Sequence, residues 1–189
     1  MLDAIWTVRG RGIANPAWPS GVRSLLFLCH ANLCRSPFAE RLAQQRLRQA
    51  GLSHITCASA GFRINPLVRP PADAIAVAAR YGVQLGDHQP VFVTLRHVQA
   101  ADVVFVMEAR QWTLVRRRWP ARADRLFLLP QFLAPDTSLG AWDRLHIPDP
   151  YGRGEAAFEQ SYERIAQTID EIVALLGSQR TGRYSASRV

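Results

Sequence analysis

The sequence has few of the features that mark secreted or membrane proteins. It holds three cysteines, Cys29, Cys34 and Cys57, and this small odd number does not form the disulfide framework of a secreted domain. No apolar run approaches the roughly 20 residues of a membrane helix. No basic start followed by an apolar run marks a signal peptide, and no internal repeat is visible. We therefore expect a cytoplasmic protein that does not insert into a membrane.

Lysine is absent, since all 23 basic residues are arginine, and the formal net charge is +8. Such usage is typical of a compositional bias of the source genome, although it also favours attraction to anionic partners. Part of the excess lies near the ends of the chain, because residues 178–189 hold three arginines and no acid. The charge is therefore weak evidence about a functional site.

The chain has 189 residues, of which 48% are apolar, and this suits one domain with a full hydrophobic core. Residues 1–23 are rich in glycine and proline and are expected to form an N-terminal extension, a loose lead-in outside the core. The predicted domain covers residues 24–177, and residues 178–189 are predicted to be a flexible basic tail.

Short apolar runs alternate with helical patterns along this domain. Strands are predicted at 24–28, 55–60, 102–107 and 125–129, and helices at 37–47, 72–81, 108–119 and 155–176. Residues 91–98 fit a strand or a helix, and 130–151 is a long loop with several prolines. This order predicts an α/β three-layer sandwich, in which a four-stranded parallel sheet carries helices on both faces. Ligands of such sheets bind beyond the carboxyl ends of the strands.

A thiol and an arginine bracket the loop that follows the first predicted strand. Cys29 opens this loop, and Arg35 closes it just before a helix. Main-chain N–H groups and a helix N-terminus can together hold a tetrahedral dianion, and a guanidinium adds a bidentate fork. The same positive field favours the thiolate of Cys29, which can attack bound phosphorus and form a phosphocysteine. The pattern predicts a phosphate-binding loop with a nucleophile.

Two further loop residues have both structural and chemical interpretations. Ser36 can cap the following helix, with Pro37 at its first position, and can also hydrogen-bond the sulfur and ease its departure. Asn32 is expected to hold the loop, because asparagine tolerates left-handed backbone.

Phosphoryl transfer also needs a proton donor for the leaving oxygen. Asp149 is the best candidate, because prolines on both sides restrict its backbone and aim its carboxyl group. Tyr151, two residues on, is predicted to form a wall for an aromatic substrate ring.

These stretches resemble the low-molecular-weight protein tyrosine phosphatase family, in its bacterial form. The resemblance runs from about residue 24 to 176, and its motifs follow one another in the expected order: Leu25-Leu26-Phe27-Leu28-Cys29, Asn32, Cys34-Arg35-Ser36-Pro37, Ser59-Ala60-Gly61, Ala101-Asp102 to Val106-Met107 and Pro148-Asp149-Pro150-Tyr151. It implies that residues 24–177 form a phosphatase domain. Ala31 departs from the glycine that is usual at its position.

The resemblance implies catalytic roles for three residues and no metal or other cofactor. Cys29 would be the nucleophile, Arg35 the transition-state binder and Asp149 the general acid and then base. The phosphate and the ring of the substrate would be held by His30, Ala31, Asn32, Leu33, Cys34, Arg35, Ser36, Phe62 and Tyr151. The resemblance also implies a Cys29–Cys34 disulfide under oxidation, which would reversibly block the nucleophile and makes Cys34 a redox residue.

The resemblance also carries expectations about neighbouring groups and partners. His88 resembles the family histidine that braces Asn32 and Ser36. Family members with an aliphatic residue at the position of Leu33 favour phosphotyrosine, and those with threonine there favour phosphoarginine. Phosphotyrosine is therefore the expected substrate and phosphoarginine the alternative. The expected partner is a phosphotyrosine-containing protein such as a tyrosine autokinase, because bacterial relatives often act on kinases that control exopolysaccharide export. We expect a monomer or weak dimer.

Three other functions fit parts of the sequence. Arsenate reductase shares the fold, but it needs further cysteines at about residues 75–100, and this segment has none. Cys29, His30 and Cys34 could bind a metal, although Arg35 would oppose a cation. Nucleic-acid binding is suggested by the run Arg116-Arg117-Arg118-Trp119, but such a run is more often a solvated helix face. The expectation is that no nucleic acid is bound.

Overall fold

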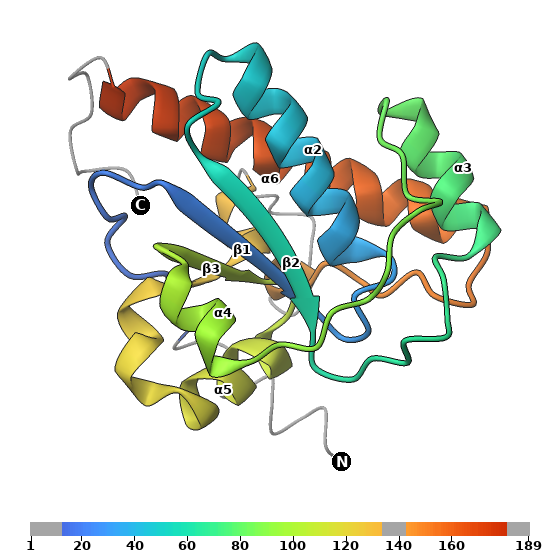
Figure 1. Ribbon diagram of the computed structural model, residues 1–189, viewed down its shortest axis with the longest axis horizontal. Helices are drawn as coiled ribbons and strands as arrows, with labels where there is room; N and C mark the ends of the chain where they lie inside the picture. The colour runs from blue at the N-terminus through green and yellow to red at the C-terminus, as the bar shows by residue number, and fades with distance from the viewer. Residues whose placement is uncertain (1–12, 134–142, 181–189) are drawn as a thin grey trace.

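A sheet of four parallel strands forms the centre of the protein (Figure 1). The computed structural model describes residues 13–133 and 143–180. The strands lie in the order β2-β1-β3-β4 and comprise β1 (Ser24–Cys29), β2 (Thr56–Gly61), β3 (Val103–Val106) and β4 (Leu126–Leu128). β1 and β3 lie inside the sheet and are covered on both faces, which explains their unbroken apolar sequences.

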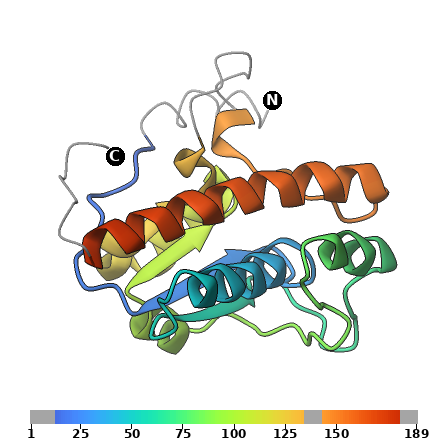
Figure 2. The ribbon, with the colours of Figure 1, turned by 90° about the horizontal axis from the view of Figure 1, so that it is seen from above.

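Helices cover both faces of this sheet, which confirms the predicted three-layer sandwich. On one face lie α2 (Arg35–Gln49), α3 (Ala72–Arg80) and α6 (Glu155–Arg180), whereas α4 (Leu95–Ala100) and α5 (Ala109–Arg118) lie on the other (Figure 1). Seen from above, α6 runs past α2, with which it makes extensive contact (Figure 2). Short 3-10 segments comprise η1 (Pro120–Arg125), η2 (Leu129–Phe132) and η3 (Asp143–Leu145). None of the helices in the described part of the chain is long and apolar enough to cross a membrane.

The apolar stripe predicted for the last helix faces the core. Phe158, Tyr162, Ile165, Ile169, Ile172 and Leu176 are all buried. Helix α6 continues to Arg180, so the predicted tail 178–189 begins inside its last turn. The rest of that tail, 181–189, lies outside the described residues.

The N-terminal lead-in is a correction to the sequence-based prediction. Trp18 is 7% exposed, and its ring lies 5.2 Å from that of Phe127 in an edge-to-face arrangement. Asn15 bonds both main-chain groups of Leu128 on β4, with its Nδ2 donating at 3.3 Å and its Oδ1 accepting at 2.6 Å. Residues 13–23 are therefore part of the packed structure, and the prediction of a loose lead-in is wrong for them.

The structure also resolves the ambiguous segment at 91–98. Phe92 bridges to Gly61 as a single parallel pair, and helix α4 follows from Leu95. The segment is thus partly a strand-like bridge and partly a helix. Within the predicted long loop 130–151, η2 and η3 flank residues 134–142, which lie outside the described residues.

Candidate active site

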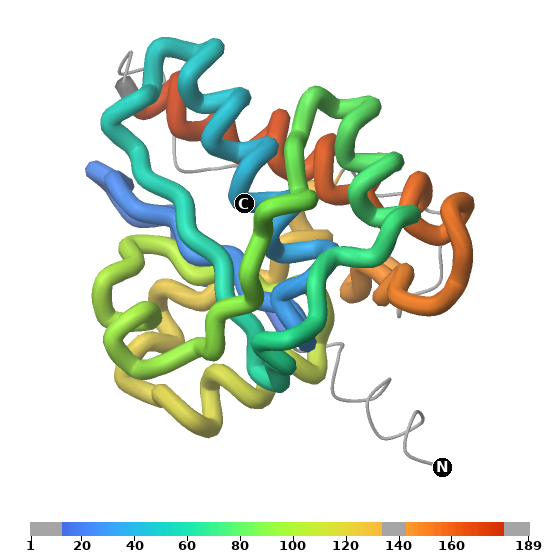
Figure 3. Tube along the Cα trace, turned by 45° about the vertical axis from the view of Figure 1, so that its right-hand side comes forward, coloured from blue at the N-terminus to red at the C-terminus, as the bar shows by residue number. Residues whose placement is uncertain are grey.

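The predicted phosphate loop lies at the carboxyl edge of the sheet. β1 ends at Cys29 and α2 begins at Arg35, and the segments after β1 and β2 leave the sheet at the same edge (Figure 3). A cavity of about 410 Å³ opens there. Its described lining comprises Cys29, His30, Ala31, Leu33, Cys34, Arg35, Arg63, Ile64, Asn65, Val68, Asp149 and Tyr151.

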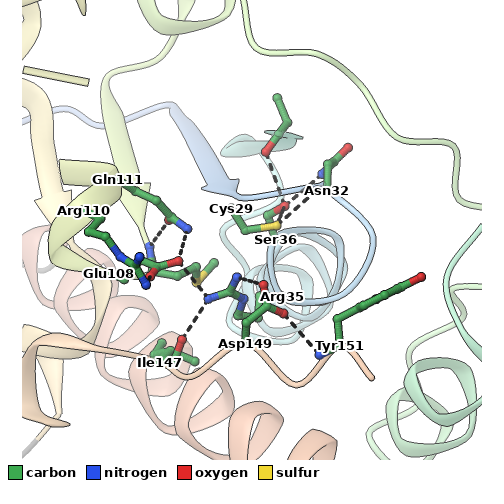
Figure 4. Close-up of polar contacts among 12 residues, drawn as sticks. Cys29, Asn32, Arg35, Ser36, Glu108, Arg110, Gln111, Ile147, Asp149 and Tyr151 are labelled. Carbon is green, nitrogen blue, oxygen red and sulfur yellow. Dashed lines mark hydrogen bonds and ion pairs between the residues drawn. The ribbon is translucent and has the colours of Figure 1, made fainter. Parts of the chain in front are cut away.

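The sulfur of Cys29 is buried and has polar contacts with the loop and with the first turn of α2 (Figure 4). The main-chain N–H of Asn32 donates to it at 3.3 Å, and the hydroxyl oxygen of Ser36 lies 2.9 Å away. Since Ser36 already accepts a hydrogen bond from Nδ2 of Asn32 at 2.9 Å, its own proton is available to the sulfur. Two hydrogen-bond donors therefore lie beside the sulfur.

This geometry corrects one prediction for Ser36. Helix α2 begins one residue earlier, at Arg35, and no side chain caps it. The hydroxyl of Ser36 lies beside Cys29 and, at 3.4 Å, the carbonyl oxygen of Ala60. Of the two roles predicted for Ser36, the helix cap is wrong, because the hydroxyl faces the sulfur.

Asn32 organises the loop from beneath and does not line the cavity. It is fully buried, and it alone among the described non-glycine residues has a positive φ, of 54°. Its Oδ1 accepts the N–H of Val91 at 2.8 Å, and its Nδ2 donates to Ser59 at 2.8 Å. Ala31 does not adopt the left-handed conformation, so the loop needs no glycine there.

Gly61 allows β2 to approach this loop closely. A Cβ atom at Gly61 would lie 2.8 Å from both the carbonyl carbon of Ala31 and the main-chain nitrogen of Asn32. Only glycine fits at such a distance without a shift of the backbone.

His88, which was predicted to brace Asn32 and Ser36, contacts the first of these. Its Nε2 lies 2.8 Å from the carbonyl oxygen of Asn32, so the ring must donate this hydrogen bond. Burial lowers the pKa of His88 from its ordinary value, and the hydrogen bond to Asn32 only partly offsets this effect. His88 is therefore a neutral donor that supports the left-handed turn.

The guanidinium of Arg35 is almost completely buried and is held from two sides (Figure 4). Its NH1 group donates to Oε1 of Glu108 at 3.3 Å and to the carbonyl oxygen of Ile147 at 3.0 Å. Its NH2 group pairs with the carboxylate of Asp149. Its Nε–H, in contrast, is buried and has no partner among the described residues.

Glu108 was missed by the sequence analysis. It lies two residues after β3. Its carboxylate accepts hydrogen bonds from NH1 of Arg35 and, at 2.5 Å, from Nε2 of Gln111. Gln111 is fixed in turn, because its Oε1 accepts the N–H of Met107 at 3.0 Å. The position of an acid just beyond a strand of a parallel sheet was the available signal.

The long loop after β4 places Asp149 at the cavity because the sheet anchors it. Ile147 is buried, and its N–H donates to the carbonyl oxygen of Met107 at 2.9 Å. Oδ1 of Asp149 accepts the N–H of Tyr151 at 3.3 Å, which orients the carboxyl group. Tyr151 is 55% exposed, and its ring points away from Arg35 at the mouth of the cavity (Figure 4).

Phe62 does not lie where it was predicted. It is 9% exposed and packs in the apolar cluster on the α5 face of the sheet, which excludes it from the cavity lining. Ile64 and Val68, from the same loop, line the cavity in its place. The prediction of Phe62 as a substrate wall is therefore wrong.

Three further predicted site residues line the cavity, namely His30, Leu33 and Cys34. His30 is exposed at the mouth, and Leu33 is a buried part of the wall. Cys34 is a buried free thiol, and both burial and the neighbouring Cys29 raise its pKa. Arg116, Arg117 and Arg118 lie on α5 and do not line the cavity.

A thiol at the start of a strand-to-helix loop, with a buried arginine and an adjacent carboxyl group, defines a cysteine-based phosphate site on a parallel α/β sheet. The model of the family "Low molecular weight phosphotyrosine protein phosphatase" matches residues 24–181. The low molecular weight protein-tyrosine-phosphatase Etp of Escherichia coli K12 is 33% identical over 150 residues, which cover 78% of this chain and 90% of Etp.

Solved structures agree. The tyrosine phosphatase AmsI of Erwinia amylovora is 28% identical with a TM-score of 0.70, and the match covers 84% of this chain and 97% of that one. The YwlE arginine phosphatase of Geobacillus stearothermophilus matches with a TM-score of 0.72 over 86% of this chain and 98% of its own, but at 22% identity this likeness shows the fold alone. The chain belongs to the low molecular weight phosphotyrosine protein phosphatase family, which confirms the family and the enzyme class that the sequence predicted.

Proposed function

We propose that the protein hydrolyses phosphotyrosine in proteins through a phosphocysteine at Cys29. The observation that carries this proposal is the buried Nε–H of Arg35 in the cavity wall, which has no hydrogen-bond partner among residues 13–133 and 143–180. A charged donor left without a partner is costly, and phosphate oxygens would pair with Nε and NH2 as a bidentate fork. NH1 already donates to Glu108 and Ile147, and these hydrogen bonds fix the orientation of the guanidinium.

In the first step, the thiolate of Cys29 attacks phosphorus. A sulfur–phosphorus bond forms as the bond from phosphorus to the tyrosine oxygen breaks, and protonated Asp149 gives its proton to that oxygen. Arg35 and the loop N–H groups stabilise the charge on the equatorial oxygens. Since Asp149 pairs with Arg35 in this structure, the incoming phosphate must take over the guanidinium and release the carboxyl group.

In the second step, the Asp149 carboxylate accepts a proton from water as the water oxygen attacks phosphorus. The sulfur–phosphorus bond breaks, and inorganic phosphate and the Cys29 thiolate are released. Ser36 donates its hydroxyl proton in a hydrogen bond to the departing sulfur, which it contacts at 2.9 Å.

The chemistry of the cavity wall favours phosphotyrosine over phosphoarginine. Leu33, Ile64 and Val68 offer aliphatic surface to an aromatic ring, and Tyr151 lies at the mouth. The one acid of the described lining is Asp149, which the proposed mechanism uses as the proton donor, so this lining offers no further carboxylate to the guanidinium of phosphoarginine. Arsenate reduction needs further cysteines near the nucleophile for a disulfide cascade. Cys57 cannot serve in this way, because it lies on β2 outside the cavity.

The cellular setting belongs to the same proposal. We place the enzyme in the cytoplasm, where its free thiols stay reduced, and expect it to act as a monomer or weak dimer on a phosphotyrosine protein such as a tyrosine autokinase. No metal takes part in the two steps.

Turnover of phosphotyrosine peptides by the purified protein tests the proposal. Wild type should release phosphate in the presence of a chelator, Cys29→Ser should release none, and Cys57→Ser should match wild type. Phosphate release by Cys29→Ser, or equal turnover of phosphoarginine, would overturn it. A pull-down from source cells with Asp149→Ala, which should retain bound substrate, would identify the phosphoprotein.

A further inference from the structure

One charged side chain at the cavity is not explained by the two chemical steps. Three charged residues line the cavity within the described part of the chain: Arg35, Asp149 and Arg63. Arg35 and Asp149 pair with each other. The guanidinium of Arg63 is exposed and makes no ion pair or hydrogen bond with any described residue. The mouth of the cavity thus carries an unpaired positive charge.

The main chain fixes Arg63 relative to the nucleophile. The N–H of Phe62 donates to the carbonyl oxygen of Cys29 at 3.3 Å, and the N–H of Arg63 donates to that of His30 at 2.9 Å. These two bonds extend the pairing of β1 and β2, whose last matched residues are Cys29 and Gly61. Arg63 is therefore attached to the phosphate loop itself.

Phe62 and its neighbour Arg63 have different surroundings. Phe62 packs into the apolar cluster of the α5 face, whereas Arg63, the next residue, is exposed and lines the cavity. Arg63 consequently lies on the cavity side, beside exposed His30. In the proposed function the phosphate binds deeper, at buried Arg35, so exposed Arg63 would face the parts of a substrate that lie outside the phosphotyrosine ring.

We propose that Arg63, together with His30, forms a subsite for a carboxylate side chain close to the phosphotyrosine of the substrate protein. The inference rests on the proposed function, and it names the substrate class as phosphotyrosine flanked by aspartate or glutamate. An arginine that has no acidic partner of its own can offer its full fork to a carboxylate. Because Arg63 is exposed, its ion pair with the substrate carboxylate should raise affinity only modestly, and this gain in affinity should depend on salt.

Matched phosphotyrosine peptides test this subsite. Each peptide carries Asp, Ala or Arg at one position within two residues of the phosphotyrosine, and kcat/KM is measured at low and high salt. At the best position we expect wild type to prefer Asp over Ala by about threefold to tenfold at low salt, with a smaller preference in 0.5 M NaCl. The Asp preference should disappear in Arg63→Gln and turn into an Arg preference in Arg63→Glu.

Arg96→Gln is the matched control, because it makes the same change in net charge at an exposed residue of α4 outside the cavity. It should keep the Asp preference. Equal kcat/KM for all peptides in wild type would overturn the subsite while leaving the phosphatase assignment intact, whereas no turnover of any peptide would overturn the proposed function. An equal loss for p-nitrophenyl phosphate and the Asp peptide in Arg63→Gln would place the side chain on the phosphate and also overturn the subsite.

Discussion

The hydroxyl of Ser36 lies 2.9 Å from the sulfur of Cys29, and its one other acceptor among the described residues is the more distant carbonyl oxygen of Ala60. A hydrogen bond to a charged group contributes about 1.5–3 kcal/mol, which corresponds to roughly 10- to 100-fold in rate. Ser36→Ala should therefore slow breakdown of the phosphocysteine by that factor. Rapid mixing with p-nitrophenyl phosphate should show a burst of nitrophenolate followed by slow turnover. A variant with the wild-type steady-state rate would remove Ser36 from the second step.

Replacement of Asp149 should affect substrates according to their leaving groups. A general acid contributes about 10²- to 10⁴-fold where the leaving oxygen needs a proton. Asp149→Ala should therefore lose most activity on phosphotyrosine and much less on p-nitrophenyl phosphate, whose leaving group is a weaker base. Asp124→Ala, an exposed acid outside the cavity, should behave as wild type. Equal losses on the two substrates would exclude the acid role.

Glu108 should act by positioning Arg35. Glu108→Ala leaves NH1 of a buried guanidinium with one partner, the carbonyl of Ile147. We expect roughly a 10- to 100-fold fall in kcat/KM, with a parallel loss of vanadate affinity. Glu108→Gln, which keeps an acceptor oxygen, should recover part of both. Arg110→Gln is the control, since Arg110 lies 3.8 Å from the same carboxylate and faces solvent. Unchanged vanadate binding in Glu108→Ala would contradict this role.

His88 should make stability depend on pH. Its pKa is lowered in the folded protein by burial, so below about pH 6.5 the unfolded chain binds a proton that the folded chain resists. The contribution of His88 is complete above the unfolded pKa and is lost as the pH falls, by at most about 1.4 kcal/mol per pH unit. Urea unfolding between pH 7 and 5 should show a smaller slope for His88→Gln, which keeps a donor for Asn32 but does not titrate. Identical slopes would contradict the prediction.

Cys34 should protect the nucleophile from irreversible oxidation. Peroxide oxidises Cys29 to the sulfenic acid, and the Cys34 sulfur can then form a disulfide with loss of water. Activity should return on reduction in wild type and in Cys57→Ser, but not in Cys34→Ser, whose sulfenic acid proceeds to the sulfinic acid. Since burial raises the pKa of Cys34, disulfide formation should quicken as the pH rises. Equal recovery in all three proteins would exclude the protective role.

The sequence predicted the parts of the site whose geometry is local. Cys29 and Arg35 occupy the two ends of one short strand-to-helix loop, so their proximity follows from spacing. Asp149 lies 114 residues from Arg35 and was found because a proline-flanked acid was sought as the proton donor once the Cys29 loop had been recognised. Glu108 was missed although it follows a predicted strand, since an acid before a helix is also an ordinary start of that helix.

Tertiary packing determined what the sequence left undecided. Phe62 and Ile64 are both apolar residues of one loop, and which of them enters the cavity depends on the cluster that receives Phe62. Trp18 was missed because glycine and proline around it are typical of a loose segment, although its ring packs against Phe127.

The side chain of Asn15 has a consequence for solubility. Its amide bonds the N–H and C=O of Leu128 as a fifth strand would, and β4 is the outer strand on that side. A bare outer strand is a template for pairing with another molecule. A chain shortened to start at Ser24 would lack Asn15 and would leave these main-chain groups of β4 exposed. The shortened protein should therefore self-associate at lower concentrations than the full chain.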